Sequence, residues 1–503
     1  MKTATNLINS ALARTALMLA QTAISFFMLP FLLSRLGDKW YGIWTILGGL
    51  VGYYYLMDFG LATAVSRYVT RYIAKGETQK TNSVITTSLI IYSLMAIVIL
   101  AITVLPCLGV SFFVPDKESL TVVRLVLLIL GLQMGLEFPF KAFAGIIGAF
   151  VRYELLSLSG FFSLILGAGL TVFFMLQGYG IIALALIGFF CSQLSNVIFY
   201  LIAKHLFPDM EIGRKHFAKE RVRGLFGYSV WSFIIQMGDQ LRLRIDSFVI
   251  GFFLSATQVT HYFIGARLVE LFMNLTYRAT NITTPVFTKY HAVGDYDQIR
   301  DKLLFLTKVN TIIAAFGGGL IIIHGKDFIQ RWVGQDYGDS YTILVILTIG
   351  IIFEIINNPT NNVLYAISKH RYLALINISE GVINLILSIV LIRYYGIKGV
   401  AIGTVIPLIF SRIVLIPLYV CKCIDLSFFI YFSASSKILL YSSIYFYLSY
   451  HYFIQSFLLP QYPMILISII LLTPVYFSSI MFLFFKKDER IFLLSLLPAS
   501  NCS

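Results

Sequence analysis

Long apolar runs recur along the whole chain, and they limit its possible folds more than any other feature. A bilayer core needs about 20 apolar residues per helix. The 503-residue chain is 58% hydrophobic and 12% charged, whereas soluble domains carry about 25% charged residues. We therefore predict an all-α polytopic membrane protein. Its runs predict fourteen spans, near residues 9–34, 41–64, 84–107, 121–149, 153–176, 181–203, 227–253, 259–288, 303–323, 340–366, 372–393, 398–420, 432–451 and 463–485.

The basic residues between these runs predict how the chain is oriented. If the N-terminus is cytoplasmic, inner segments carry more than twice as many Lys and Arg residues as outer ones, which is the usual bias of membrane proteins. We predict cytoplasmic N- and C-termini. The net charge of +14 then reflects topology, so we predict no nucleic-acid partner. The longest loop, His205 to Gly224, is basic; it is either a linker with a topology signal or a docking site for a cytoplasmic partner.

The chain contains an internal repeat with a nearly constant offset. Three pairs of segments match at offsets of 221, 219 and 216: 31–44 with 252–265, 148–160 with 365–381, and 179–186 with 395–402. Each repeat holds six spans, an even number, so the two halves enter the membrane in the same direction as parallel repeats. Two six-helix lobes around a cavity are typical of transporters that work by alternating access. We predict an N-lobe (1–204), a basic cytoplasmic linker (205–226), a C-lobe (227–421) and two further helices with a cytoplasmic tail (422–503).

Motifs for catalysis and for cofactors are absent from the sequence. Gly325-Lys326-Asp327 lacks the glycine spacing and the final Ser or Thr of a phosphate-binding loop. The sequence has no HExxH motif and no histidine cluster, and its five cysteines form no CxxC pair. All loops are short, which leaves no room for a soluble catalytic domain. We predict a protein that is not an enzyme and that holds no cofactor and no metal.

Charged residues inside the predicted spans are the candidate functional residues, because a charge at the centre of a membrane helix costs about 2.5–3.5 kcal/mol on insertion scales. Some have an opposite charge three or four positions away, where helical side chains meet. Whether these are structural pairs or functional groups stays open at this point. They are Glu137 with Lys141, Arg267 with Glu270, and the series Asp239, Arg242 and Asp246.

Other intramembrane charges have no such local partner. Four are cationic and two are acidic, so a cavity lined by them would favour an anion. Arginine suits phosphate because its guanidinium presents a planar fork of donors. Pairing between helices is the alternative, and Arg14 is close enough to the inner end of its span to reach the interface. These residues are Arg14, Arg244, Arg278, Arg412, Glu354 and Glu380.

Asp58 precedes an amphipathic segment, 59–77, that carries Arg67 and Arg71. Because aspartate is a favoured N-cap residue, we predict that Asp58 caps this helix rather than binding an ion. The arginine face would then lie on the lipid headgroups of the inner leaflet.

Two stretches resemble a known family. LSRLGDKWYGIWTILGGL…DFGLATAVSRYV (Leu33 to Val69) is similar to the start of polysaccharide-transport proteins of the MOP exporter superfamily. RLRIDSFVIGFFLSATQVTHYFIGARL (Arg242 to Leu268) is similar to their seventh and eighth helices, with Asp246 at a typical position. The resemblance extends to fourteen spans, two MATE-like six-helix lobes and two additional C-terminal helices, whereas drug exporters of the superfamily usually stop at twelve helices.

The resemblance implies a Wzx-type flippase of a bacterial plasma membrane. Such a protein moves an undecaprenyl-diphosphate-linked oligosaccharide, a unit of O-antigen, capsule or exopolysaccharide, to the outer leaflet, and an ion gradient is thought to drive it. Glycan polymerases and other assembly proteins are possible partners besides the substrate and membrane lipids. A MATE-like drug or cation antiporter is the alternative, and a membrane glycan polymerase or ligase is a weaker one.

The intramembrane charges receive roles on this hypothesis. We expect Arg244 and Arg278, supported by Arg242, to contact the diphosphate. The wider set of substrate-binding candidates adds Arg14, Arg412 and Lys141. Glu354 or Glu380 is the expected coupling-ion site. The remaining acids, Asp246, Asp239 and Glu270, serve either ion coupling or structural pairing.

Overall fold

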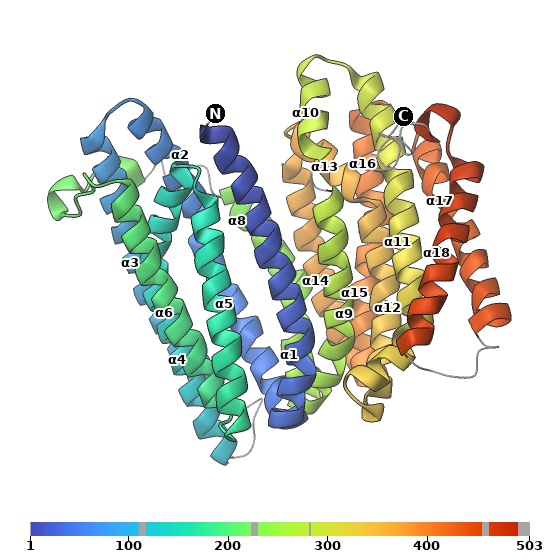
Figure 1. Cartoon of the computed structure of the whole chain (residues 1–503), viewed down its shortest axis with the longest axis horizontal. Coiled ribbons are helices and arrows are strands. Elements are labelled where there is room, and N and C mark those ends of the chain that lie inside the picture. Colours follow the sequence, from blue (N-terminus) through green and yellow to red (C-terminus); the bar gives the residue numbers. More distant parts are fainter. Residues whose placement is uncertain (1, 110–116, 223–229, 281–282, 455–461, 491–503) are drawn as a thin grey trace. The chain divides into compact units, whose positions relative to one another are not determined.

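The chain is helical throughout the part that the structure describes, as its composition requires. In hydrocarbon no water can satisfy backbone N–H and C=O groups, so a spanning segment must bond them internally. The computed structural model describes residues 2–109, 117–222, 230–280, 283–454 and 462–490, and these ranges contain no β-strand. Figure 1 shows the helices and their labels.

The helices account for the fourteen predicted spans. Ten helical stretches among the described residues are long and apolar enough to cross a membrane, and the first, Asn9–Ala74, contains two predicted spans. Three more predicted spans overlap α8 (Val230–Phe253), α9 (Ala256–Thr280) and α17 (Phe428–Ser449), which hydropathy alone does not select. In α8 and α9 the reason is the set of charged residues they carry. The predicted span 259–288 is longer than α9 and ends within the next helix, Thr284–Ala292.

The Cα packing divides the chain into two units. Unit 1 comprises residues 1–261 together with Asn377–Leu385, and unit 2 comprises Tyr262–Ile376 with residues 386–503. The packing thus groups α8 with unit 1, whereas the sequence repeat places it at the start of the second lobe. The lobe boundaries derived from the repeat remain a prediction.

Unit 1 is built mainly from long helices. It also contains α8 and the middle of α14 (His370–Tyr395). Its other elements in chain order are α1 (Lys2–Tyr54), the 3₁₀ turn η1 (Tyr55–Asp58), α2 (Leu61–Ala74), α3 (Thr78–Gly109), α4 (Lys117–Ala149), α5 (Tyr153–Leu176), α6 (Ile181–Leu206) and the 3₁₀ turn η3 (Arg214–His216).

The long helix α1 joins the first two predicted spans and breaks at a glycine. Gly37 has φ 72° and ψ 169°, a left-handed conformation that glycine adopts without steric cost. A second glycine, Gly42, lies against the start of α9: a Cβ added there would sit 1.8 Å from the carbonyl oxygen of Ala256. Thr260 of α9 donates a hydrogen bond to the carbonyl of Asp38 at 2.7 Å. The second half of α1 and the first turns of α9 are therefore in close backbone contact.

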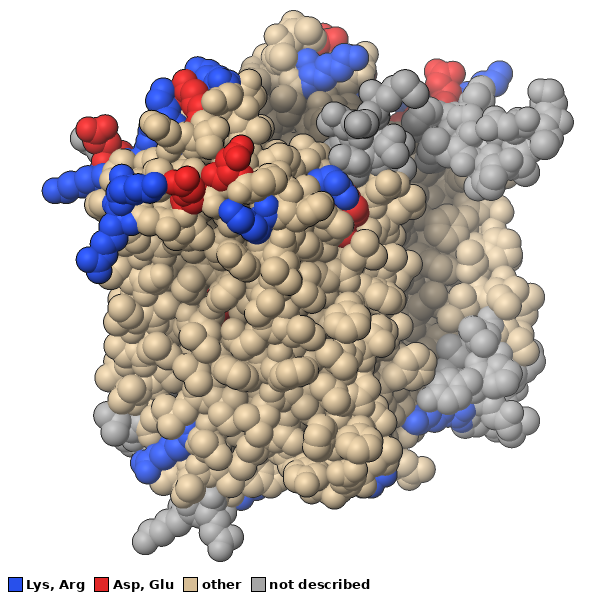
Figure 2. Space-filling view, turned by 60° about the vertical axis from the view of Figure 1, so that its left-hand side comes forward, with Lys and Arg blue, Asp and Glu red and all other residues tan. Residues whose placement is uncertain are grey.

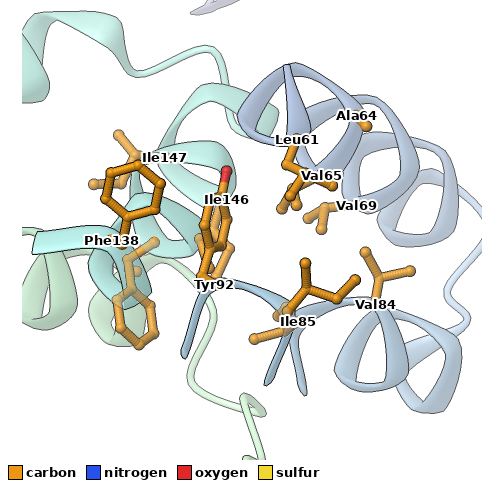
Figure 3. Packing of buried hydrophobic residues seen from close by; sticks show 14 of the residues in the cluster. Leu61, Ala64, Val65, Val69, Val84, Ile85, Tyr92, Phe138, Ile146 and Ile147 are labelled. Atoms are coloured by element: carbon orange, nitrogen blue, oxygen red, sulfur yellow. The ribbon is translucent and has the colours of Figure 1, made fainter. Parts of the chain in front are cut away.

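A core of apolar side chains joins α2, α3 and α4 (Figure 3). Leu61, Val65 and Val69 recur every four residues, so they lie on one face of α2, and all three are fully buried. They pack with Ile85 of α3 and Ile146 of α4. This core fixes the position of α3 and α4 relative to the turn that carries Asp58.

The loop after α6 is folded against α3. Asn82 of α3 donates to the carbonyl of Asp209 at 3.0 Å and accepts from the backbone N–H of Glu211 at 3.2 Å. Within the loop, Lys215 and His216 contact the Glu211 carboxylate, and their hydrogen bonds hold the pKa of Glu211 below its usual value. Both alternatives for this loop, linker or docking site, remain open.

Unit 2 contains several interrupted helices. The predicted span 340–366 breaks at Asn357, one residue before the start of α13, and the predicted span 398–420 contains the π-helical turn η6. Besides α9, most of α14, and α17, the elements are α10 (Thr284–Ala292), α11 (Tyr296–Trp332), the 3₁₀ turn η5 (Gln335–Tyr337), α12 (Gly338–Ile356), α13 (Asn358–Ala366), α15 (Ile397–Phe410), η6 (Ser411–Leu415), α16 (Ile416–Cys423), the π turn η7 (Tyr450–Ile454) and α18 (Tyr462–Phe484).

The internal repeat reappears in the backbone. α4 ends at Ala149 and α13 ends at Ala366, which are 217 positions apart. Two residues after each end, Val151 and Ser368 have positive φ values of 54° and 58°. Such angles are uncommon for residues other than glycine, so their recurrence at the same offset indicates one duplicated turn.

The surface separates apolar and charged side chains. On the face shown in Figure 2, charged residues gather at the upper and lower ends, and the band between them is almost free of charge. Many large apolar side chains are exposed, among them Phe162, Leu186 and Ile470. Exposed apolar surface on this scale indicates contact with lipid, and the chain is a multi-pass membrane protein.

Candidate functional site

The middle of α14 pairs with α8 through polar side chains. Arg242 of α8 and Glu380 of α14 form a buried ion pair with 3.5 Å between Nη1 and Oε1. Asn384, one turn further along α14, donates to the Arg242 carbonyl at 3.5 Å. Gly381 allows the helices to approach, because a Cβ there would lie 2.9 Å from the Cβ of Leu241. The polar face of α14 is therefore turned toward another helix.

Unit 2 holds a tighter ion pair. The Nε of Arg412 donates to Oε2 of Glu354 at 2.9 Å, and the Tyr277 hydroxyl donates to Oε1 at 2.6 Å. Arg412 is 1% exposed and Glu354 is 3% exposed. Arg412 lies in the π turn η6; such turns occur frequently at functional sites.

These contacts bear on the alternative of pairing between helices. Arg412, Glu354 and Glu380 have no opposite charge three or four positions away in the sequence. The structure pairs each across helices, at separations of 58 and 138 positions. Each glutamate thus has a buried arginine as its counter-charge.

Arg244 differs from its neighbours on α8. Its side chain is half-buried and makes no hydrogen bond or ion pair with the residues that the structure describes. It lies against α1, where a Cβ on Gly52 would be 3.9 Å from its Cγ. The adjacent Tyr53 donates to the Gln240 carbonyl at 3.4 Å, and its ring packs edge-on to Phe248.

Arg14 is another predicted cation of unit 1 that forms no ion pair with the residues that the structure describes. Its guanidinium stands 4.1 Å from the ring centroid of Tyr153, at the start of α5, a cation–π contact. The side chain is exposed. The nearby carboxylate of Glu154 is instead held by Ser10 and Arg152.

The remaining candidates fall into two groups. Arg278 and Asp239 lie on α9 and α8, but their side chains are outside the described part of the chain. Arg267 and Glu270 form the expected pair on α9, with 2.5 Å between Nη1 and Oε2. Asp246 is 5% exposed on α8.

Lys141 and Glu137 belong to a polar cluster inside unit 1. The Lys141 ammonium stands 4.0 Å from the Phe138 ring centroid and 4.6 Å from that of Tyr55. It forms no hydrogen bond and no ion pair within 4 Å with described residues, although Glu137 acts on it electrostatically. Glu137 accepts instead from Tyr55 at 3.4 Å and from Ser192 at 3.1 Å.

Asp58 is part of this cluster and does not cap α2. The N-cap residue of α2 is Gly60, in a left-handed conformation and without a side-chain cap. The Asp58 carboxylate accepts a hydrogen bond from the Tyr92 hydroxyl at 2.6 Å. Asp58 and Glu137 are the two carboxylates that act electrostatically on Lys141. The prediction of a cap is therefore wrong, because the chain turns before α2 and directs Asp58 toward α3.

A cavity of about 340 Å³ adjoins the cluster between α4, α5 and α6. Its polar lining includes Gln133, Glu137 and Lys141 of α4, Ser163 of α5, and Ser192 and Asn196 of α6. Sequence reasoning named Glu137, Lys141 and Asp58 separately but did not bring them together at a cavity, although one signal pointed to Glu137. Glu137 and Glu354 are 217 positions apart, the same offset that separates the ends of α4 and α13.

Solved structures share the fold. The lipid II flippase MurJ in an inward closed conformation aligns with a TM-score of 0.70 and 18% identity, covering 94% of this chain and 98% of that one. An inward-facing multidrug resistance MATE transporter of the MOP superfamily aligns with a TM-score of 0.66 and 16% identity, covering 81% and 94%. At such identities the likeness establishes the MOP fold alone.

Sequence relatives point to one family. The membrane protein EpsK of Bacillus subtilis, named as uncharacterized, is 22% identical over 82% of this chain and 83% of its own length. A candidate O-antigen transporter of Shigella flexneri is 23% identical over 80% and 95%. The family described as "Polysaccharide biosynthesis protein" matches residues 32–315, more than half of the chain. The chain belongs to this polysaccharide biosynthesis protein family.

Proposed function

We propose that the protein is a flippase for a polyprenyl-diphosphate-linked oligosaccharide. The observation that carries this proposal within the family is Arg244, a half-buried arginine in a membrane helix with no acid bound to it among the described residues. An arginine at this depth is costly unless it meets a counter-charge. A passing diphosphate would supply that charge, and a guanidinium fork matches its oxygens.

Other cations support an anionic substrate. Arg14 is exposed without an acidic partner among the described residues, and Arg278 remains a candidate from its position in α9. Arg412 and Arg242 are held by Glu354 and Glu380, so we assign them to the scaffold rather than to the substrate. Lys141 is assigned to a separate site, described below.

The proposed transport has no covalent step. The sugar and diphosphate need a polar route across the bilayer, because each charge in hydrocarbon is costly, whereas the polyprenyl chain can stay in lipid. Alternating access of two repeat-related lobes provides such a route. We place the protein in a bacterial plasma membrane with cytoplasmic termini, and glycan polymerases and other assembly proteins are the expected neighbours.

Export of drugs or cations is the second candidate, since MATE transporters have the same fold. A cation exporter requires acids that can bind the substrate. In unit 2, Glu354 is neutralised by Arg412 and Glu270 by Arg267. This pairing favours the anionic substrate, and a cell line that gains dye resistance on expression would favour the exporter.

The test is complementation of a deletion strain. Deletion should make lipid-linked oligosaccharide accumulate on the cytoplasmic leaflet, and the wild-type gene should restore surface glycan. We expect Arg244→Ala to reach the membrane at normal levels yet to restore less than about a tenth of the surface glycan. Normal export by this variant would remove Arg244 from the substrate site.

Two variants serve as controls. Arg244→Lys keeps the charge but loses the planar fork, so partial export is expected. Arg35→Ala removes an exposed arginine of the neighbouring α1 and should export normally. If the deletion strain shows no accumulation of the lipid-linked intermediate at all, the flippase proposal itself is contradicted.

A further inference from the structure

Each unit contains a tyrosine hydroxyl bonded to a glutamate at matching positions, half-buried in unit 1 (Glu137) and buried in unit 2 (Glu354). Tyr55 donates to Glu137 in unit 1, and Tyr277 donates to Glu354 in unit 2. The glutamates are 217 positions apart and the tyrosines 222, within or next to the spacing of the internal repeat. The duplication has therefore preserved the pair, and the two copies can be compared as natural variants of one arrangement.

The copies differ in the cation that faces the glutamate. In unit 2 this is Arg412, bonded at 2.9 Å from η6. α6 and α15 begin 216 positions apart, at Ile181 and Ile397, so the place of Arg412 is taken in unit 1 by neutral residues, Ser195 and Asn196. Both line the cavity of about 340 Å³ beside Glu137.

Unit 1 has a different cation and one more acid. Lys141, one turn after Glu137, corresponds to the neutral Asn358 of unit 2. Asp58 acts electrostatically on Lys141 and is bonded by Tyr92. At offsets of 221 and 222, the residues that correspond to Asp58 are the uncharged Ala279 and Thr280; the side chain of Arg278, just before them, lies outside the described part of the chain. Among the described side chains, unit 1 thus combines two carboxylates with one ammonium, whereas the unit 2 cluster combines one carboxylate with one guanidinium.

Charge balance then separates the two clusters. Counting the side chains named above, all of them described, and with every group ionised, the unit 2 cluster is neutral and the unit 1 cluster carries one net negative charge. A net charge on half-buried groups of a membrane helix bundle is unfavourable, and one monovalent cation at the unit 1 cluster removes it. Glu137 is the acceptor available for that cation, since its described partners are two neutral hydroxyls and it borders the cavity.

We propose that Glu137, with Lys141 and Asp58, forms a proton-binding site inside unit 1, and that unit 2 holds an inert copy of it. A proton from water in the cavity forms an O–H bond on the Glu137 carboxylate, and its return to water restores the carboxylate. When Glu137 is ionised, two carboxylates, those of Glu137 and Asp58, act electrostatically on Lys141; when Glu137 is protonated, only Asp58 does. The site's occupancy therefore changes the electrostatic balance between η1, α3 and α4.

The groups around Glu137 define what titrates. α4 contributes Lys141, η1 contributes Tyr55 and Asp58, and α3 contributes Tyr92, while α5 and α6 contribute only the neutral lining of the cavity and the free thiol of Cys191. Among the described residues of these elements no arginine contacts Glu137. This distinguishes it from Glu354, Glu380 and Glu270, each of which is bonded by one.

Infrared spectroscopy of the purified full-length protein in lipid tests the site without reference to any substrate. Protonation of a buried carboxyl produces a C=O stretching band that titrates with pH. We expect such a band to disappear in Glu137→Gln, which keeps the shape of the protonated acid, and to persist in Glu354→Gln. In Lys141→Gln the midpoint of the titration should move to higher pH, because a nearby cation favours the ionised form.

Three results would overturn the proposal. One is a wild-type protein without a titrating carboxyl band. Another is a band that survives in Glu137→Gln. The third is a band that Na⁺ abolishes at constant pH, since that would make the site a sodium site. If Glu137→Gln fails to fold, Lys141→Gln alone decides the matter, because an unchanged midpoint would exclude Lys141 from the site.

A second experiment asks whether the proton drives transport, and this part rests on the proposed function. In vesicles, the rate at which a polyprenyl-diphosphate-linked oligosaccharide becomes accessible on the far side should rise with an imposed pH gradient for the wild type. We expect Glu137→Gln to lose that dependence on the pH gradient. Transport with no gradient dependence in either protein would overturn coupling but leave the flippase proposal intact. No transport by the wild type would contradict the flippase proposal alone, because the infrared result stands independently.

Discussion

At the scale of single residues, Arg412 and Glu354 form an ion pair in the interior of unit 2. Both side chains are almost fully buried, and the bond between them is 2.9 Å long. Removing one partner of such a pair leaves an uncompensated buried charge, which costs about 3–5 kcal/mol, whereas replacing both by apolar residues of similar size is often neutral. The pair therefore gives the fold less net stability than its geometry suggests, although each half depends on the other.

This asymmetry leads to a prediction for substitutions at the pair. Arg412→Met and Glu354→Leu should each lower the free energy of unfolding by about 3–5 kcal/mol, and the double variant should return close to the wild type. Reversible unfolding in mixed micelles measures all three. If the double variant loses as much free energy of unfolding as the two single variants together, the two residues are not coupled.

The half-exposed pair on α9 provides the matched control. Arg267→Met removes a guanidinium from an ion pair whose side chains are 33% and 36% exposed. Pairs of this kind contribute about 0–1 kcal/mol, so the variant should unfold almost like the wild type.

The charges themselves were visible in the sequence, but their partners were not. The spacing along the helix correctly indicated an ion pair between Arg267 and Glu270, because helical residues three apart share a face. The same spacing rule indicated an ion pair between Lys141 and Glu137, but the lysine packs over two aromatic rings. Arg242 and Arg412 bond to acids on other helices, and a single sequence does not reveal which helices lie side by side.

At the scale of helices, glycine determines how closely α1 approaches the chain around it. Gly42 lies where a Cβ would meet the backbone of Ala256, and backbone has little freedom to move aside. Gly48 lies less than two turns further along α1, and a Cβ added there would have no neighbouring atom within 4 Å. Two glycines of one helix thus stand in opposite surroundings.

We expect opposite effects from alanine at these two positions. Gly42→Ala should lower stability by about 1–3 kcal/mol, the usual cost of overpacking. Gly48→Ala should raise it by about 0.5–1 kcal/mol, because alanine loses less conformational freedom in a helix than glycine. Thermal unfolding in detergent compares the two. A gain in stability for Gly42→Ala would show that α1 and the start of α9 are not in close backbone contact.

Helix interruptions were only partly predictable. Apolar runs located the spans, since the bilayer sets their length. The sequence did not show that a predicted span would end at Tyr54 and continue as a 3₁₀ turn, which places Asp58 beside Tyr92. It also did not show the break at Asn357, whose side chain accepts from the Tyr431 hydroxyl at 2.7 Å. Such interruptions depend on polar partners from distant helices.

At the scale of the whole molecule, native cysteines can report the proposed orientation. Cys107 lies near the end of α3 and Cys423 ends α16, and both are partly exposed, whereas Cys191 and Cys421 are buried. With cytoplasmic termini, Cys107 belongs to the outer side and Cys423 to the inner side.

A membrane-impermeant maleimide should therefore label a variant that retains only Cys107 in intact cells. A variant that retains only Cys423 should react only after the cells are opened. Denatured samples of both variants control for the total amount of reactive thiol. The reverse pattern would invert the proposed topology, and with it the direction of transport.

The class and the family of the protein could be predicted from its sequence. The length of the apolar runs, the charge of the loops and the offset of the repeat can all be read directly from the order of the residues. The clusters could not be predicted, because they assemble residues from three or four helices. The comparison of the two repeats is an intermediate case. The sequence shows that Glu137 and Glu354 are separated by the spacing of the repeat, but only the structure shows that a tyrosine donates a hydrogen bond to each of them.

The separation of 138 positions between Arg242 and Glu380 also has a consequence for biosynthesis. At about 5–20 residues per second, Glu380 is synthesised roughly 7–28 seconds after Arg242. During that interval α8 has left the ribosome without Glu380, one of the groups that contact its arginine. The buried ion pair between α8 and α14 therefore forms only after both helices have been synthesised, so it is a late contact in the assembly of unit 1.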